Sequence, residues 1–110
     1  MIHQFTKENI DAIGKVLGAT PKPLGDDVFR IEVKNEEENR KLALEVHLGL
    51  DANGEKMNMV SVYSYNTFLQ LHNVTAFVAS DMLQQVTFFG KSGTKTSGLI
   101  VEKAAGCSLY

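Results

Sequence analysis

The sequence contains a single cysteine, two prolines and no tryptophan among its 110 residues. Because Cys107 is the only cysteine, no disulfide forms within the chain, which is typical of proteins of the reducing cytoplasm. No stretch approaches the roughly 18 consecutive apolar residues of a membrane-spanning helix. Residues 1–18 include Lys7, Glu8 and Asp11 and lack the apolar core of a signal peptide. We therefore predict a cytoplasmic protein with no membrane segment.

Neither sign of charge is in large excess. The chain has 11 Lys and Arg residues against 13 Asp and Glu residues, for a formal net charge of −2. A general nucleic-acid-binding protein needs an excess of positive charge to neutralise phosphates, so this composition argues against that class. The length fits one domain over residues 1–110, which is either complete or a fragment of a longer chain.

The sequence also lacks the motifs of cofactor, metal and catalytic sites. His3, His47 and His72 are far apart and have no metal-ligand spacing. The loop 90–96 contains Gly, Lys, Ser and Thr, but no Gly precedes its second Lys and a strand-like run follows. It therefore predicts a hairpin turn rather than a phosphate-binding loop. We predict no cofactor, no metal site and no catalytic residue.

Residues 6–17 have the pattern of an amphipathic helix with defined ends. Thr6 is a suitable N-cap, and Phe5 and Ile10 are spaced as a hydrophobic staple. Gly18 suits the left-handed position that ends a helix, and prolines follow it. The helix has one apolar face, which we expect to pack on a sheet.

Most segments after the prolines have the two-residue alternation or the β-branched and aromatic content of a strand. Residues 41–50 alternate most regularly, and Asn53 and Gly54 predict a hairpin after them. A helix over residues 76–85 is an alternative, but Val, Thr and Phe at the start of that run favour a strand. We predict strands over residues 28–34, 41–50, 57–65, 67–74, 75–79, 85–89 and 95–103, and residues 107–110 have the pattern of the start of another strand.

These elements predict an α+β fold in one domain. The N-terminal amphipathic helix, about residues 6–17, packs on a mainly antiparallel sheet of about five to seven strands. The sheet is a β meander over about residues 28–110, because tight turns join its strands. Alternation alone does not decide between an open sheet and one curled into a half-barrel.

Charge is distributed unevenly along the chain. Residues 57–90 contain one charged residue, Asp81, whereas about a quarter of the residues of a typical protein are charged. Interface cores are depleted of charge and enriched in Met and aromatic residues. We therefore predict a non-enzymatic protein-binding or assembly domain, a homodimer or a subunit, acting through the sheet surface of residues 57–90. Its candidate interface or ligand-binding residues are Met57, Met59, Tyr63, Tyr65, Phe68, Leu71, His72, Phe77 and Phe88.

Two other functions fit the same sequence. The first is a carrier of a small apolar ligand, with a pocket inside a curled sheet lined by Phe68, Leu71, Phe77, Phe88 and Leu99. The second is an enzyme of unknown class that uses His47, His72 or Cys107. The position of these side chains relative to the sheet distinguishes the three functions.

Overall fold

A computed structural model describes the backbone of residues 1–110 and every side chain except that of Ala52. One helical segment packs on one sheet, which confirms the predicted α+β class. The elements in chain order are β1 (Ile2–Gln4), η1 (Lys7–Asn9), α1 (Ile10–Leu17), β2 (Lys22–Pro23), β3 (Val28–Asn35), β4 (Arg40–Ala52), β5 (Glu55–Ser64), β6 (Thr67–Ser80), β7 (Gln85–Ser92), β8 (Lys95–Glu102) and β9 (Cys107–Leu109).

The sheet has nine strands rather than the five to seven predicted. Strand β9 forms where residues 107–110 predict one, and the unpredicted strands β1 and β2 are two or three residues long. Such short segments carry too few positions for a two-residue alternation to be recognised. The remaining strands follow the predicted order closely.

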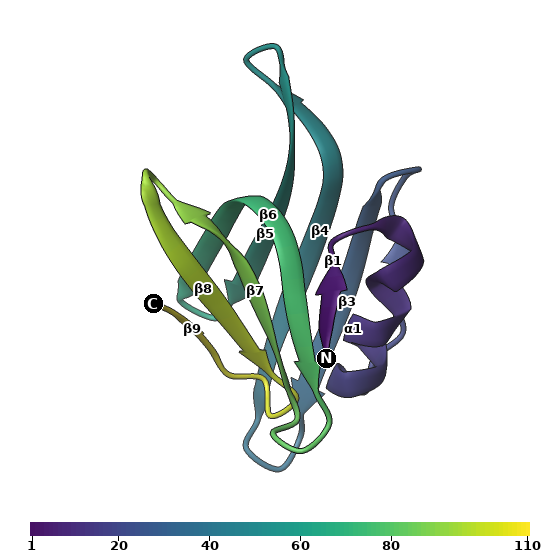
Figure 1. Cartoon of the computed structure of the whole chain (residues 1–110). Helices are drawn as coiled ribbons and strands as arrows, with labels where there is room; N and C mark the ends of the chain where they lie inside the picture. Colours follow the sequence, from purple (N-terminus) through teal and green to yellow (C-terminus); the bar gives the residue numbers. More distant parts are fainter.

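The sheet is the predicted antiparallel meander. From β2 to β9 each strand pairs with the next one along the chain, and β1 pairs with the second half of β6. The sheet curls around α1 and the core without closing into a barrel, and the β4–β5 hairpin projects beyond the rest (Figure 1). No helix of the described chain is long and apolar enough to cross a membrane.

The helical segment begins differently from the prediction. A 3₁₀ turn at Lys7–Asn9 precedes α1, and the Thr6 hydroxyl makes no capping hydrogen bond to the helix backbone. The Thr6 side chain acts on Glu8 in place of the helix backbone. The pKa of Glu8 is lowered mainly by a hydrogen bond from its own backbone N–H and secondly by a hydrogen bond from the Thr6 side chain. Gly18 ends the helix in the left-handed conformation, as predicted.

The region around residues 67–85 is strand followed by turn. The two predicted runs 67–74 and 75–79 are one strand, β6, which is interrupted by a change of register between His72 and Ala76. Residues 81–84 form a turn, so the strand interpretation is confirmed and the helical alternative is wrong.

One face of the sheet, the inner face, carries the hydrophobic core. Phe77 and Phe88 lie opposite each other on β6 and β7, and Phe5 contacts both rings edge-on at centroid distances of 6.3 and 5.9 Å. His3 stacks on Phe77 at 4.9 Å. Aromatic contacts of this kind stabilise beyond the area they bury. The segment before the helix is thereby joined to the centre of the sheet.

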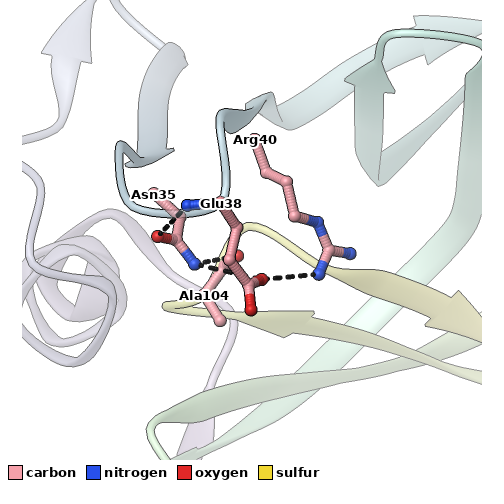
Figure 2. Close-up of polar contacts among 4 residues, drawn as sticks. All are labelled: Asn35, Glu38, Arg40 and Ala104. Carbon is pink, nitrogen blue, oxygen red and sulfur yellow. Dashed lines mark hydrogen bonds and ion pairs between the residues drawn. The ribbon is translucent and has the colours of Figure 1, made fainter.

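A polar network joins the two ends of the curled sheet. The Asn35 side chain, at the end of β3, donates to the Ala104 carbonyl in the β8–β9 turn at 3.3 Å (Figure 2). Glu38 accepts from Arg40 at 3.3 Å, and its backbone N–H donates to Asn35. These contacts hold together two turns that are 69 residues apart in the sequence.

We expect Phe77→Ala to lower the free energy of unfolding by about 3–5 kcal/mol, because it leaves a cavity in the centre of the core. Phe77 is 0% exposed, whereas Phe68 on the same strand is 54% exposed. Urea denaturation measures both variants, with Phe68→Ala as the matched control. Equal destabilisation by the two substitutions contradicts this assignment of the core.

Candidate functional site

Part of the predicted interface lies on the outer face of the sheet, which faces away from the core. Because residues directly opposite in antiparallel strands lie on the same face, the register places Met59 beside His72 and Tyr63 beside Phe68 there. The Tyr63 and Phe68 rings are 5.1 Å apart. The remaining two residues lie near the strand ends: Met57 is half-buried, and Tyr65 is exposed in the β5–β6 turn.

The other three predicted interface residues are not surface residues. Leu71, Phe77 and Phe88 are fully buried on the inner face. Their prediction as interface or ligand-binding residues is therefore wrong: they belong to the core, which takes alternate residues of the same strands.

The residues of the predicted apolar pocket do not line one cavity. Leu71, Phe77, Phe88 and Leu99 pack in the core with no exposed surface. Phe68 lies on the opposite face of the sheet. The structure therefore fills the place where the predicted ligand pocket would lie.

The three residues of the enzyme hypothesis are divided between the two faces of the sheet. His47 and His72 are on the outer face, where each lies directly opposite Met59. Cys107 lies opposite Val101 and packs against the core on the inner face. The structure therefore separates the thiol from the imidazoles and brings the two imidazoles to either side of one methionine. We call His47, Met59 and His72 the histidine–methionine row.

Charged side chains border this row on one side. Glu45 Oε1 lies 3.4 Å from His47 Nε2, and its other oxygen lies 3.7 Å from the guanidinium of Arg30. The side chains of His47 and Glu45 are about four-fifths buried, with 21% and 19% exposed. Glu45 and His47 therefore lie beside each other on the outer face of β4, with the carboxylate close to one imidazole nitrogen.

Two bulges flank the row. The register of β4 against β5 shifts just after His47, and that of β6 against β7 shifts just after His72. Asn58, the neighbour of Met59, holds both irregular segments: its side chain accepts from Gly49 N–H at 2.9 Å and donates to the Val74 carbonyl at 3.1 Å. Bulges re-aim side chains and are frequent next to functional sites. The row therefore sits at a point where three strands are held together by one side chain.

The backbone beside His72 is closely packed. A Cβ atom at Gly90 of β7 would lie 2.5 Å from the His72 carbonyl oxygen, so only glycine fits there. The close approach of β7 holds the strand that carries His72. The sequence contains no recognisable motif for this arrangement, because the three residues of the row come from three strands.

A second feature of the outer face is an area whose side chains carry no charge. It extends over β1, the second half of β6, β7, β8 and the C-terminal end of the chain, where register and side-chain alternation place Glu102 at one rim and Lys91 at the other. We call this area the uncharged patch. Its apolar members are Ile2, Ala76, Val78, Phe89, Ile100 and Tyr110.

Gly98 shapes the uncharged patch. Gly98 and Tyr110 exchange both backbone hydrogen bonds, at 2.7 and 2.9 Å, which continues the pairing of β8 and β9. The Tyr110 ring lies over Gly98, where an added Cβ would be 3.0 Å from the ring. The ring thus covers a strand position that has no side chain of its own.

Cys107 lies at a surface hollow of about 690 Å³ at the end of the sheet that carries the network of Figure 2. Arg40, Lys41 and Tyr65 also line this hollow. Partial burial raises the pKa of the Cys107 thiol, and nearby Arg40 opposes that shift only in part. A thiol that stays protonated is a poor nucleophile.

No family model matches the chain, and no curated protein sequence and no solved structure is detectably similar to it. Among the described side chains, no group of three or more His, Cys, Asp or Glu residues is placed to hold a metal ion.

We expect Asn58→Ala to lower the free energy of unfolding by about 1–3 kcal/mol, because it removes two hydrogen bonds that hold both bulges. Urea denaturation measures the change. Asn66→Ala in the exposed β5–β6 turn is the matched control, and we expect it to have little effect. A variant at Asn58 as stable as the wild type contradicts the role of this side chain.

The raised pKa of Cys107 has a measurable consequence. We expect the rate of alkylation by iodoacetamide to reach half its maximum at a higher pH in the folded protein than in the urea-unfolded chain. The thiolate is the reactive form, so a raised pKa shifts the rate profile to higher pH. A folded-state midpoint at or below the unfolded one contradicts the effect of burial.

Proposed function

We propose that this chain is a non-enzymatic assembly domain that forms a homodimer through the uncharged patch. The observation that supports the proposal is the charge distribution on the outer face. Between the rims at Glu102 and Lys91, adjacent strands carry apolar or neutral polar side chains only. Surfaces of monomeric proteins seldom leave large apolar areas uncovered.

The exposed side chains of the patch are of the types that interfaces use. Phe89 is 39% exposed, Tyr110 is 62% exposed and Ile2 is 76% exposed. Aromatic residues are enriched at interfaces because they bury a large area with few rotatable bonds. Smaller side chains at Ala76 and Val78 lie between them, so an incoming aromatic ring has space against the sheet.

A second copy of this chain is the partner that the charge pattern favours. A two-fold interface brings the same surface of both copies together, so any charge at its centre would meet an equal charge. The uncharged patch avoids this repulsion, whereas the Arg30, Glu32 and Glu45 side of the outer face does not. Antiparallel sheets also pack readily face to face.

The single cysteine is consistent with assembly in a reducing compartment, and we propose the cytoplasm as the site of action. Cys107 is a free thiol that packs against the core of its own chain. The proposed dimer therefore forms by contact of the uncharged patch, without an intermolecular disulfide.

Sedimentation over a concentration series tests the proposal. We expect wild-type protein to change from monomer to dimer between the low micromolar and the millimolar range. We expect Phe89→Glu to remain monomeric across this range, because the dimer would bury two unpaired carboxylates.

The matched control is Phe68→Glu, which places the same charge on an exposed phenylalanine of the outer face away from the patch. This variant should dimerise like the wild type, and circular dichroism checks that both variants are folded. A wild-type protein that is monomeric at every concentration overturns the proposal. So does equal loss of the dimer in both variants.

A further inference from the structure

We infer that the histidine–methionine row is a binding site for a soft monovalent metal ion, Cu(I). The inference is independent of the proposed dimer, because the row lies outside the uncharged patch. It rests on three donor side chains that the register places next to one another on one face of three adjacent strands.

The strand register determines the geometry of the site. His47 and His72 each lie directly opposite Met59, one on either side. Directly opposed residues have Cβ atoms about 4.5–5.5 Å apart, so all three side chains project from neighbouring positions. Met59 therefore lies between the two imidazole side chains on one face of the sheet.

The chemistry of the donors selects the metal. Thioether sulfur is a soft ligand that favours Cu(I), and imidazole binds copper well. Divalent zinc prefers sites with a thiolate, a carboxylate or further imidazoles. The row has two imidazoles and one thioether, so Cu(I) is the ion that it fits best.

The surroundings of His47 support a role as a metal ligand. A ligating histidine usually donates the N–H of its other ring nitrogen to a carboxylate, a backbone carbonyl or water. Glu45 lies 3.4 Å from His47 Nε2, which leaves Nδ1 available for a metal ion. Because Arg30 also contacts Glu45, the carboxylate is held in place from its far side.

The strands that carry the three donor side chains are also fixed in position by contacts with neighbouring strands. Asn58 ties the bulge after His47 to the bulge in β6, and Gly90 lets β7 pack against the backbone of His72. Lys91 lies directly opposite His72 in the register, and its side chain is exposed. Supporting contacts of this kind are what a metal site needs to keep its ligands aligned.

Anaerobic titration of the intact chain with Cu(I), in competition with the chelator bicinchoninate, tests the site. We expect one Cu(I) per chain. We expect Met59→Leu, which keeps the side-chain volume, and Glu45→Gln each to weaken binding by about tenfold or more.

Two substitutions serve as controls. Met82→Leu removes an equivalent thioether from an exposed turn, where Met82 is 95% exposed. His3→Gln removes the imidazole that stacks on Phe77 on the inner face, away from the row. Both variants should bind Cu(I) like the wild type.

A second measurement on the wild-type protein needs no variant. With methyl-¹³C-methionine, Cu(I) should shift the methyl resonance of Met59 and leave those of Met1 and Met82 in place. Failure of the protein to retain Cu(I) against the chelator overturns the inference. So do unchanged binding by folded Met59→Leu and a shift confined to Met1, Met57 or Met82.

Discussion

The structure depends on the burial of the inner face of a nine-stranded sheet beneath a helix of only eight residues. So short a helix covers a small part of such a sheet, and the sheet has to curl in order to bury the rest against itself. Phe77 and Phe88 form the centre of this core, and Phe5 joins the helical segment to them. The network at Asn35 and Ala104 holds the curled ends together.

The curl of the sheet is accompanied by register shifts and by an uncovered surface on the outer face. Strands β4 and β6 change register where they bend, and each change follows a histidine on the outer face. The same curl leaves the outer face without a covering layer, since α1 lies on the inner side. The proposed metal site and the proposed dimer surface are therefore two parts of one uncovered face, one at the bulges and one at the uncharged strands. Each is a consequence of how the core is buried.

Much of the fold could be predicted from local patterns. The alternation of Leu42, Leu44 and Val46 marks the inner face of β4, and Asn53 and Gly54 form the predicted hairpin turn. The alternation fails where a bulge intervenes: Leu50 continues the pattern in the sequence, yet it lies beyond the register shift and is 37% exposed. Short β1 and β2 have no strand signal in the sequence, because pairing with a longer strand, rather than their own composition, makes them strands.

The sequence alone determined the α+β class, the antiparallel meander and the existence of an uncharged surface, because each follows from periodicity, turn chemistry or charge counted along the chain. Only the tertiary structure decided which residues form that surface. In the folded chain Leu71, Phe77 and Phe88 lie in the core. Ile2, Ile100 and Tyr110, which come from distant segments, lie on the uncharged surface. It also brought His47 and His72 to either side of Met59. Strand register sets these neighbours, and register depends on pairing and bulges that no local pattern encodes.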